Sequence, residues 1–309
     1  MGKIRFPHLG FDVSMGNSFS IFGFEIAFYG IIIALGMIAG AFVAYRDAKR
    51  TGQRVDDYVD YTLFGIIGAI VGARLYYVAF EWDYYKENLS EIVNLRAGGL
   101  AIYGAIIGAV LVLLVYCRIK RKNMLQMLDT IVLGVVVGQI IGRWGNFFNR
   151  EAYGGFTDCI FAMQIPVKDA AVVRPDLLVF VDGIAHVQVH PTFLYESFFN
   201  LILFVILMLF RHKQKFHGET LCRYLLGYGI IRFFIEGMRT DQLMIKNIPV
   251  SQALSFVLAV GSLGVMITMH ILRRKSDWLV IVPASKTNKK SENTENTTSD
   301  EKTEDSGDN

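Results

Sequence analysis

Three cysteines among 309 residues are too few for a disulfide scaffold, and charged residues make up only 19% of the chain. Hydrophobic residues make up 53% and the mean hydropathy is +0.38, a balance that argues against a water-soluble globular protein. The same apolar content excludes disorder of the whole chain. The shortage of charge therefore predicts a membrane protein, provided that the apolar residues form continuous runs.

Two kinds of site are also missing from the sequence. No cluster of Cys and His has the spacing of a zinc site, and no glycine-rich phosphate loop of the nucleotide-binding kind occurs.

The net charge of +3 combines a basic body with an acidic end, since residues 286–309 contain four Lys and seven acidic residues. We therefore expect no metal site, no nucleotide loop and no nucleic acid partner.

The apolar residues do form runs long enough to cross a bilayer, which takes about 20 helical residues. We expect seven transmembrane helices from these runs. They cover Phe24–Tyr45, Tyr58–Phe80, Gly98–Cys117, Leu128–Trp144, His190–Phe210, Thr220–Glu236 and Val250–Leu272.

The basic residues predict the orientation of these helices, because short basic loops stay in the cytoplasm. Lys and Arg cluster after the first, third, fifth and seventh runs, whereas the other loops are poorer in bases. The N-terminus should therefore lie outside and the C-terminus in the cytoplasm. The first run is longer than the apolar core of a signal peptide and no small-residue cleavage site follows it, so we expect a retained anchor.

Two segments outside the apolar runs are notable for their length or composition. The segment 147–189 is too long for a simple helix connection and should form a small extracytoplasmic subdomain. Within it, Leu177–Val181 and Ile184–Val189 flank Asp182-Gly183 and predict a β-hairpin. The segment 286–309 has the composition of a disordered cytoplasmic tail.

The predicted fold class is therefore an all-α polytopic membrane protein with seven helices and a small extracytoplasmic subdomain that contains a β-hairpin. The membrane domain should cover residues 1–285. Glycines of the second and third runs place small residues on helix faces, and we expect close helix packing there. These glycines are Gly65, Gly68, Gly72, Gly98, Gly99, Gly104 and Gly108.

Several polar residues lie within the runs, where a charge costs roughly 2.5–3.5 kcal/mol on insertion scales and therefore needs a reason. The predicted orientation puts nearly all of them in the outer half of the membrane. Buried arginines need an anion, and a phosphate is the natural candidate. The residues are Arg74, Gln139, Arg143, Glu196, Arg232 and Glu236.

Simpler interpretations of these charges stay open. Arg232 and Glu236 are four residues apart on one helix face and can neutralise each other. Arginines can also pair with Glu196 across helices. A long side chain near a helix end, such as Arg143 or Arg239, can extend to the membrane interface instead.

The sequence resembles the bacterial prolipoprotein diacylglyceryl transferases in several motifs that occur in the family's order. The most specific is GRWGNFFNREAYG (142–154). The others are AFYG (27–30), GARLYYV (72–78), GGLAIYGAIIG (98–108), HPTFLYES (190–197) and GYGIIRFFIEGMR (227–239). The resemblance covers about residues 29–239.

This resemblance implies an integral enzyme of the bacterial plasma membrane whose active site faces the outer leaflet. It would transfer the diacylglyceryl group of the membrane lipid phosphatidylglycerol to the lipobox cysteine of a prolipoprotein signal peptide. The product would be a thioether, and glycerol phosphate would leave. The resemblance implies neither a metal nor a soluble cofactor. Residues 1–285 would then form the catalytic domain.

The family motifs also suggest roles for individual residues. Arg143 and Arg232 would hold the phosphate, because a guanidinium can pair two phosphate oxygens and keeps its charge in a poorly hydrated site. The other residues assigned to substrate binding are Tyr29, Asn146, Gly154, Glu196, Tyr228, Glu236 and Arg239. For Gly154, a close approach of the backbone and a turn requirement explain the glycine equally well.

The residue that activates the thiol is less clear, because this sequence departs from the family there. Many relatives have His at the position of Tyr103. A tyrosine with an ordinary pKa of about 10 is a poor base at neutral pH, so we expect Tyr103 to donate a hydrogen bond. His190 is a second candidate for the base, although a histidine at a helix start is commonly structural.

Two other functions fit buried arginines. A transporter or channel for an anionic solute also uses them, but such proteins commonly contain repeats and none is evident here. A non-catalytic lipid-binding or assembly protein would contact the same phosphate without consuming the lipid. Product formation, solute flux and binding without turnover distinguish the three functions.

Overall fold

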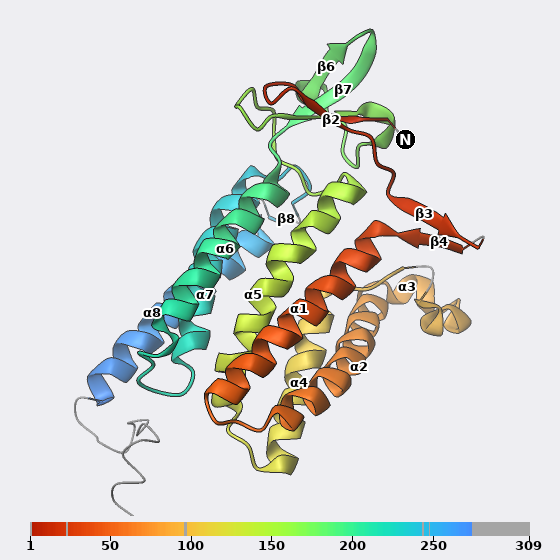
Figure 1. The fold of residues 1–309 in the computed structure, drawn as a ribbon. Coiled ribbons are helices and arrows are strands. Elements are labelled where there is room, and N and C mark those ends of the chain that lie inside the picture. Colours follow the sequence, from red (N-terminus) through yellow and green to blue (C-terminus); the bar gives the residue numbers. More distant parts are fainter. Residues whose placement is uncertain (1, 23, 96–97, 243, 247, 274–309) are drawn as a thin grey trace, which may run out of the picture.

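The computed structural model describes residues 2–22, 24–95, 98–242, 244–246 and 248–273 (Figure 1). The predicted tail at 286–309 and the end of the predicted membrane domain lie outside these residues.

Long antiparallel helices form the body of the molecule (Figure 1). Among the described residues, six of these helices are long and apolar enough to cross a membrane, so the chain is a mostly helical, multi-pass membrane protein. They are α1 (Phe28–Arg50), α2 (Val55–Phe80), α4 (Ile102–Lys120), α5 (Met124–Asn149), α6 (Thr192–Arg211) and α8 (Val250–Arg273). Helix α7 (Glu219–Met238) is as long as α6 but contains more charged residues, so a seventh crossing stays a prediction.

Several predicted helix ends were wrong. Phe24–Ala27 form strand β4, which pairs with β3 (Ser18–Ile21), and the first helix begins only at Phe28. Gly98 and Gly99 have positive φ and precede α4. His190 precedes α6, and α5 extends beyond its predicted run at both ends. The apolar runs therefore located the helices but placed the starts of three of them too early in the sequence.

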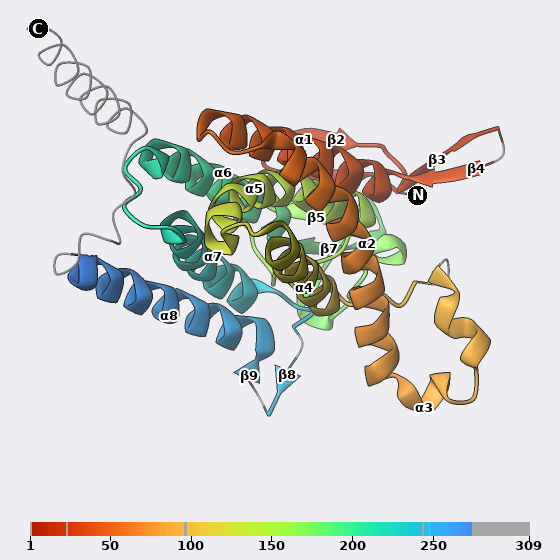
Figure 2. The ribbon, with the colours of Figure 1, turned by 90° about the horizontal axis from the view of Figure 1, so that it is seen from below.

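Helices α2 and α4 pack through their glycines, as predicted. A Cβ added to Gly72 would lie 2.4 Å from the carbonyl oxygen of Gly104, and one added to Gly108 would lie 2.1 Å from that of Gly68. Such distances leave no room for a side chain. Helices α1 and α5 form a similar contact that the sequence analysis did not predict. Seen from below, α5 lies at the centre of the helices (Figure 2).

A five-stranded antiparallel sheet covers the end of the helices where α5 ends and α6 begins (Figure 1). Its order is β2-β1-β5-β7-β6, formed by β1 (Ile4–Phe6), β2 (Phe11–Val13), β5 (Met163–Pro166), β6 (Leu178–Val181) and β7 (Ile184–Val189). Strands β6 and β7 pair around Asp182-Gly183, both with positive φ.

The sheet differs from the predicted subdomain in two ways. Its first two strands come from the N-terminus, and α5 extends to Asn149, into the segment predicted as the subdomain. Ile4, Phe6, Ile165 and Val187 pack with Phe147 of α5 in one buried cluster, so the sheet is fixed on the helix that carries the GRWGN motif.

The remaining elements are short. They are α3 (Trp82–Tyr85), η1 (Leu89–Val93), η3 (Val167–Asp169), η4 (Pro175–Leu177), β8 (Met244–Ile245) and β9 (Ile248–Pro249).

Candidate functional site

Three helices bring the predicted site residues together at the end of the bundle next to the sheet. Arg143 lies near the end of α5, Glu196 lies in the first turns of α6, and Arg232 and Glu236 lie near the end of α7. Because α6 runs antiparallel to α5 and α7, its beginning meets their ends (Figure 1). Residues far apart in sequence thus share one membrane depth.

Glu196 joins the two predicted phosphate-binding arginines. One of its carboxylate oxygens lies 2.8 Å from Nη2 of Arg143, and the other lies 3.3 Å from Nη1 of Arg232. Arg232 also pairs with Glu236 at 2.5 Å. The Glu196 side chain is 2% exposed, whereas those of Arg143 and Arg232 are 21% and 14% exposed. The carboxylate is therefore buried behind guanidinium groups that stay accessible.

Both simple ion-pair interpretations are thus present as contacts. They account for one or two N–H groups of each arginine. Nη1 of Arg143 makes only a long contact, 3.4 Å, with Asn146. Each guanidinium has five N–H donors, so donors remain for a further acceptor. The ion pairs place the two guanidiniums side by side and do not exclude an anion.

A cavity of about 690 Å³ begins at these arginines. Its polar end is lined by Tyr29, Arg143, Asn146, Arg232 and Arg239. Below them the lining comes from α1, α2 and α5 and consists mostly of glycine, alanine and aliphatic side chains. The cavity therefore combines a cationic end with a long apolar interior.

Asn146 lies one turn after Arg143 and is held by Glu151. Its Nδ2 donates to the Glu151 carboxylate at 3.0 Å, and Asn149 donates to the same oxygen at 3.2 Å. The sequence analysis missed Glu151, although it lies within the GRWGNFFNREAYG motif. An acidic residue two positions after a motif asparagine was a signal that could have found it.

Tyr228 contacts the shared carboxylate of Glu196. Its hydroxyl donates to the Glu196 carboxylate at 3.4 Å, and its ring stacks on Tyr224 at 5.6 Å with 8° between the planes. Gln139 donates to the Tyr224 hydroxyl at 2.9 Å. Tyr228 is not among the described residues that line the cavity. Its contact with the site is therefore through the Glu196 carboxylate.

Gly154 joins the sheet side of the site to the end of α7. It pairs with Arg239 in an isolated β-bridge, and a Cβ at this position would lie 2.8 Å from that of His190 and 3.0 Å from the Met238 carbonyl oxygen. Its φ is not in the left-handed region. Close approach of the backbone therefore explains this glycine, and a turn requirement does not.

Arg239 is held by a two-bond contact with Asp241, at 2.9 and 2.8 Å. Burial alone would lower the pKa of Arg239, but the Asp241 carboxylate outweighs burial and raises it. The guanidinium therefore stays charged at the cavity end. It forms a third cationic group next to Arg143 and Arg232.

Neither candidate base is among the described residues that line the cavity. Tyr103 makes a 3.0 Å hydrogen bond with Ser251, while its neighbour Ile102 lines the cavity. Nδ1 of His190 lies 3.3 Å from the Tyr195 hydroxyl, and burial lowers the pKa of this histidine. The structure thus brings the arginines together, and it shows no side-chain contact between either candidate base and Arg143 or Arg232 among the described residues.

Arg74 does not need an anion, which corrects an interpretation of the sequence. Its guanidinium is buried and donates to five backbone carbonyl oxygens between Glu91 and Gly99. It also lies over the ring of Tyr85. Arg74 therefore fixes the segment that leads into α4 and is not part of the cavity lining.

Within the described part of the chain, no group of three or more His, Cys, Asp or Glu side chains converges. The donors that do converge are guanidinium N–H groups and an amide, a set suited to an oxyanion, and two carboxylates accept from the guanidiniums and hold them in place.

Comparison with known proteins agrees with this geometry. The sequence model described as "Prolipoprotein diacylglyceryl transferase" matches residues 17–268. A phosphatidylglycerol–prolipoprotein diacylglyceryl transferase of Clostridioides difficile is 42% identical over 84% of this chain and 96% of its own length. The protein of the same name from Finegoldia magna is 44% identical over 84% and 98%.

A third relative with this name, from Listeria monocytogenes, is 42% identical over 79% of this chain and 85% of its own length. The family match covers all the helices that carry the arginine cluster and most of α8. With two arginines joined at the head of an apolar cavity and this breadth of similarity, the chain belongs to the prolipoprotein diacylglyceryl transferase family of enzymes.

Proposed function

We propose that this protein transfers the diacylglyceryl group of phosphatidylglycerol to the lipobox cysteine of bacterial prolipoproteins, the first step of lipoprotein maturation. The observation that carries the proposal is the placement of Arg143 and Arg232 on one carboxylate at the head of an apolar cavity. A phospholipid has the matching form, with an anionic phosphate at one end and hydrocarbon at the other.

In this proposal the arginines bind the phosphate of the lipid and stabilise it as it leaves. The cysteine sulfur attacks the glycerol carbon that bears the phosphate, a carbon–sulfur bond forms, and the carbon–oxygen bond to the phosphate breaks. The thiol loses its proton and glycerol phosphate departs with the bonding electrons. Charge increases on the leaving phosphate, which is where guanidinium donors lower the barrier.

The other residues support that arrangement. Glu196 holds Arg143 and Arg232 together, Glu236 holds Arg232, and Tyr228 supports Glu196. Tyr29 and Asn146 line the head-group end of the cavity together with Arg239. Gly154 allows the backbone of the sheet segment to approach α7. We propose these residues as the substrate-binding set.

Activation of the thiol stays a prediction. A thiol has an ordinary pKa of about 8.5, so a small fraction is already thiolate at neutral pH. Tyr103 and His190 remain the candidates carried over from the family motifs. Their contacts with Ser251 and Tyr195 favour positioning roles over proton transfer.

We further propose that seven helices cross the bacterial plasma membrane, with the N-terminus outside and residues 286–309 in the cytoplasm. Basic clusters follow α1, α4 and α6 at the end of the bundle away from the sheet. The positive-inside rule then puts the sheet outside and the arginine cluster towards the outer leaflet. Labelling of single cysteines, added at the β6–β7 turn and at the α4–α5 loop, with a membrane-impermeant reagent tests this orientation.

The function is tested by incubating the purified protein with phosphatidylglycerol and a lipobox peptide and measuring the peptide mass. We expect the cysteine to gain one diacylglyceryl group and glycerol phosphate to accumulate in equal amount. Lipid binding without product would support an assembly protein, and solute flux into vesicles without product would support a transporter. Either result would contradict the proposal.

A further inference from the structure

The cavity reaches much deeper into the membrane than the arginines do. Along α1 its lining extends from Tyr29 to Ala44, a rise of about 22 Å at the usual helical pitch. One leaflet of a bilayer contributes about 15 Å of hydrocarbon, half of a core of about 30 Å. The cavity is therefore deeper than one leaflet.

The walls of the deep part suit a straight apolar chain. Gly36 and Gly40 of α1 face Gly138 and Gly134 of α5, and a Cβ on Gly40 would lie 2.5 Å from the carbonyl oxygen of Gly134. The two helices thus touch backbone to backbone, and four glycines without side chains form part of the cavity wall. Some of the apolar side chains along the cavity are more than a third exposed. They include Met37, Ile66 and Val135.

Tyr58, Tyr61 and Thr62 of α2 close the deep end of the cavity. Their hydroxyl groups are engaged by the protein: Tyr61 donates to the carbonyl oxygen of Ala109 at 3.3 Å, and Thr62 accepts from Tyr45 at 3.1 Å. The Tyr58 hydroxyl donates to Gln53. These three residues, called the floor below, are therefore held in place.

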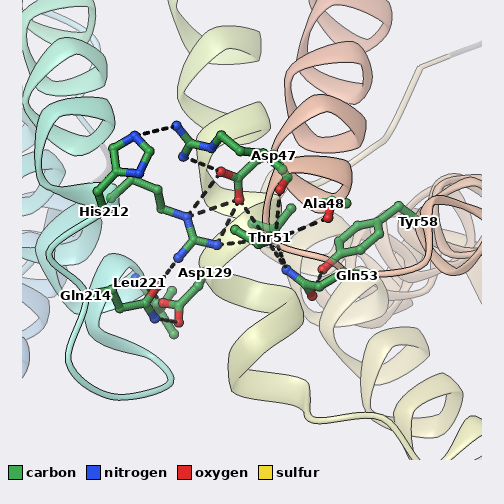
Figure 3. A network of polar contacts seen from close by, with 12 residues as sticks. Asp47, Ala48, Thr51, Gln53, Tyr58, Asp129, His212, Gln214 and Leu221 are labelled. Carbon is green, nitrogen blue, oxygen red and sulfur yellow. Dashed lines mark hydrogen bonds and ion pairs between the residues drawn. The ribbon is translucent and has the colours of Figure 1, made fainter. Parts of the chain in front are cut away.

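The floor rests on a buried network at the cytoplasmic end of the predicted topology (Figure 3). Gln53 donates to Thr130 at 3.0 Å, and Thr130 donates to Asp47 at 3.0 Å. Asp47 pairs with Arg211 at 2.8 Å, with both side chains at most 5% exposed. A buried ion pair is costly to break by removing one partner. The floor therefore cannot retreat easily to admit a longer ligand.

We propose that the floor is a length stop for one acyl chain of the donor lipid. This inference rests on the proposed function, because it places the lipid phosphate at Arg143 and Arg232. One acyl chain then runs down the glycine wall towards Tyr58, and the second chain stays in the bilayer. Chains that reach the floor are accepted, and longer ones must bend or lift the phosphate away from the arginines.

The test shortens the cavity by a substitution above the floor and measures which lipids the protein uses as donors. Ala41 lines the cavity three residues above Ala44 on α1, and Ala41→Phe adds a ring there. Ile38→Phe is the matched control, since Ile38 is 67% exposed on the same helix and is not among the described lining residues. Each protein is assayed with dilauroyl-, dipalmitoyl- and distearoyl-phosphatidylglycerol and a lipobox peptide.

For Ala41→Phe we expect the ratio of kcat/KM for the dilauroyl lipid to that for the distearoyl lipid to rise about tenfold over wild type, the effect of about 1.4 kcal/mol. Ile38→Phe should keep the wild-type ratio. A variant that deepens the cavity, Ile131→Ala, should shift the preference towards the distearoyl lipid. If Ala41→Phe does not fold, Ala41→Leu and Ile131→Ala supply the same comparison.

The outcomes separate the two proposals. If wild type forms no product from any of the lipids, the proposed function fails. If wild type forms product but the ratios of the cavity variants match those of wild type and Ile38→Phe, the length stop is wrong and the proposed function stands. Product masses in a mixture of the three lipids give an independent measure of the same preference.

Discussion

Clusters of arginine and carboxylate lie at both ends of the helices, and the inner and outer clusters differ in what surrounds them. At the inner end, Arg211 donates through all three of its nitrogens to Asp47, Thr130 and Gln214. At the outer end, Arg143 and Arg232 share Glu196 and line a cavity. The inner arginine contacts the protein through four of its five N–H donors, whereas the outer ones retain more donors beside a cavity.

An apolar layer separates the two clusters. Val132, Leu133, Val136, Leu203 and Leu207 form it between α5 and α6, and all are buried. The inner cluster also includes Asp129, which accepts from the backbone N–H groups of Gly218 and Leu221 at the start of α7. The comparison teaches that charge within an apolar run does not identify a substrate site. An accessible cavity beside the charge does.

The largest expected effect is a loss of transfer activity when an arginine of the outer cluster is removed. Arg143→Ala and Arg232→Ala should each lower kcat/KM for diacylglyceryl transfer by about a hundredfold or more, because each removes donors to the leaving phosphate. Lysine at either position should restore only a small part of the activity, since its ammonium group lacks the planar guanidinium that pairs two phosphate oxygens. Thermal unfolding in detergent checks that the variants fold. Wild-type turnover in either folded alanine variant would contradict the phosphate-binding role.

The inner cluster should affect stability and not chemistry. Arg211→Met leaves Asp47 buried with fewer partners and should destabilise the protein by about 3 kcal/mol, the lower end of the range for breaking a buried pair. The double variant Asp47→Leu/Arg211→Met should recover part of that loss. The measurement is the unfolding midpoint together with activity per folded molecule. A stable variant with lost activity would show that the two clusters are functionally coupled.

A smaller effect should follow when the shared carboxylate loses its charge. Glu196→Gln keeps the shape of the side chain but weakens its hold on both guanidiniums, so kcat/KM should fall by roughly tenfold, or about 1.4 kcal/mol. Glu219→Gln is the matched control, because Glu219 is equally buried at the other end of the bundle and pairs with Arg223. An equal loss in both variants would mean that Glu196 is only structural.

The smallest effects are expected at the candidate bases. Burial lowers the pKa of His190 below its ordinary value of about 6.5, so the imidazole is neutral at pH 7 and gains a proton only at lower pH. If His190 were the base, transfer would fall below that pH and His190→Gln would cost about a hundredfold or more. We expect His190→Gln and Tyr103→Phe each to cost less than tenfold across pH 6–9. A larger loss, with an altered pH profile, would assign the base.

Much of the fold was predictable because the bilayer limits the possibilities. Apolar runs of about 20 residues must be helices, since their backbone groups have no water to bind. The runs therefore located the long helices, and the glycines of α2 and α4 indicated their close packing. The N-terminal strands β1 and β2 were not predicted, because three-residue strands have no period to detect. Strand β2 pairs only with β1, and β1 joins the sheet through β5, more than 150 residues away.

Part of the site was predictable as well. The motifs singled out Arg143, Arg232 and Glu196, and the structure places them in contact. Arg74 was misinterpreted because its partners are backbone carbonyl oxygens, which every sequence contains. Glu151 was missed although it lies two residues after Asn149 in the motif; its hydrogen bonds with Asn146 and Asn149 form in the turn after α5.

The sequence by itself determined that this chain is a membrane protein of this family, because hydrophobicity and motif order are properties of the linear chain. Only the tertiary structure decided which arginines retain donors beside a cavity and how deep that cavity is. Those properties depend on distances between α1, α2, α5, α6 and α7, which pack through glycines and shared carboxylates. Hydrophobic burial is not directional, so it fixes the helices without fixing these distances.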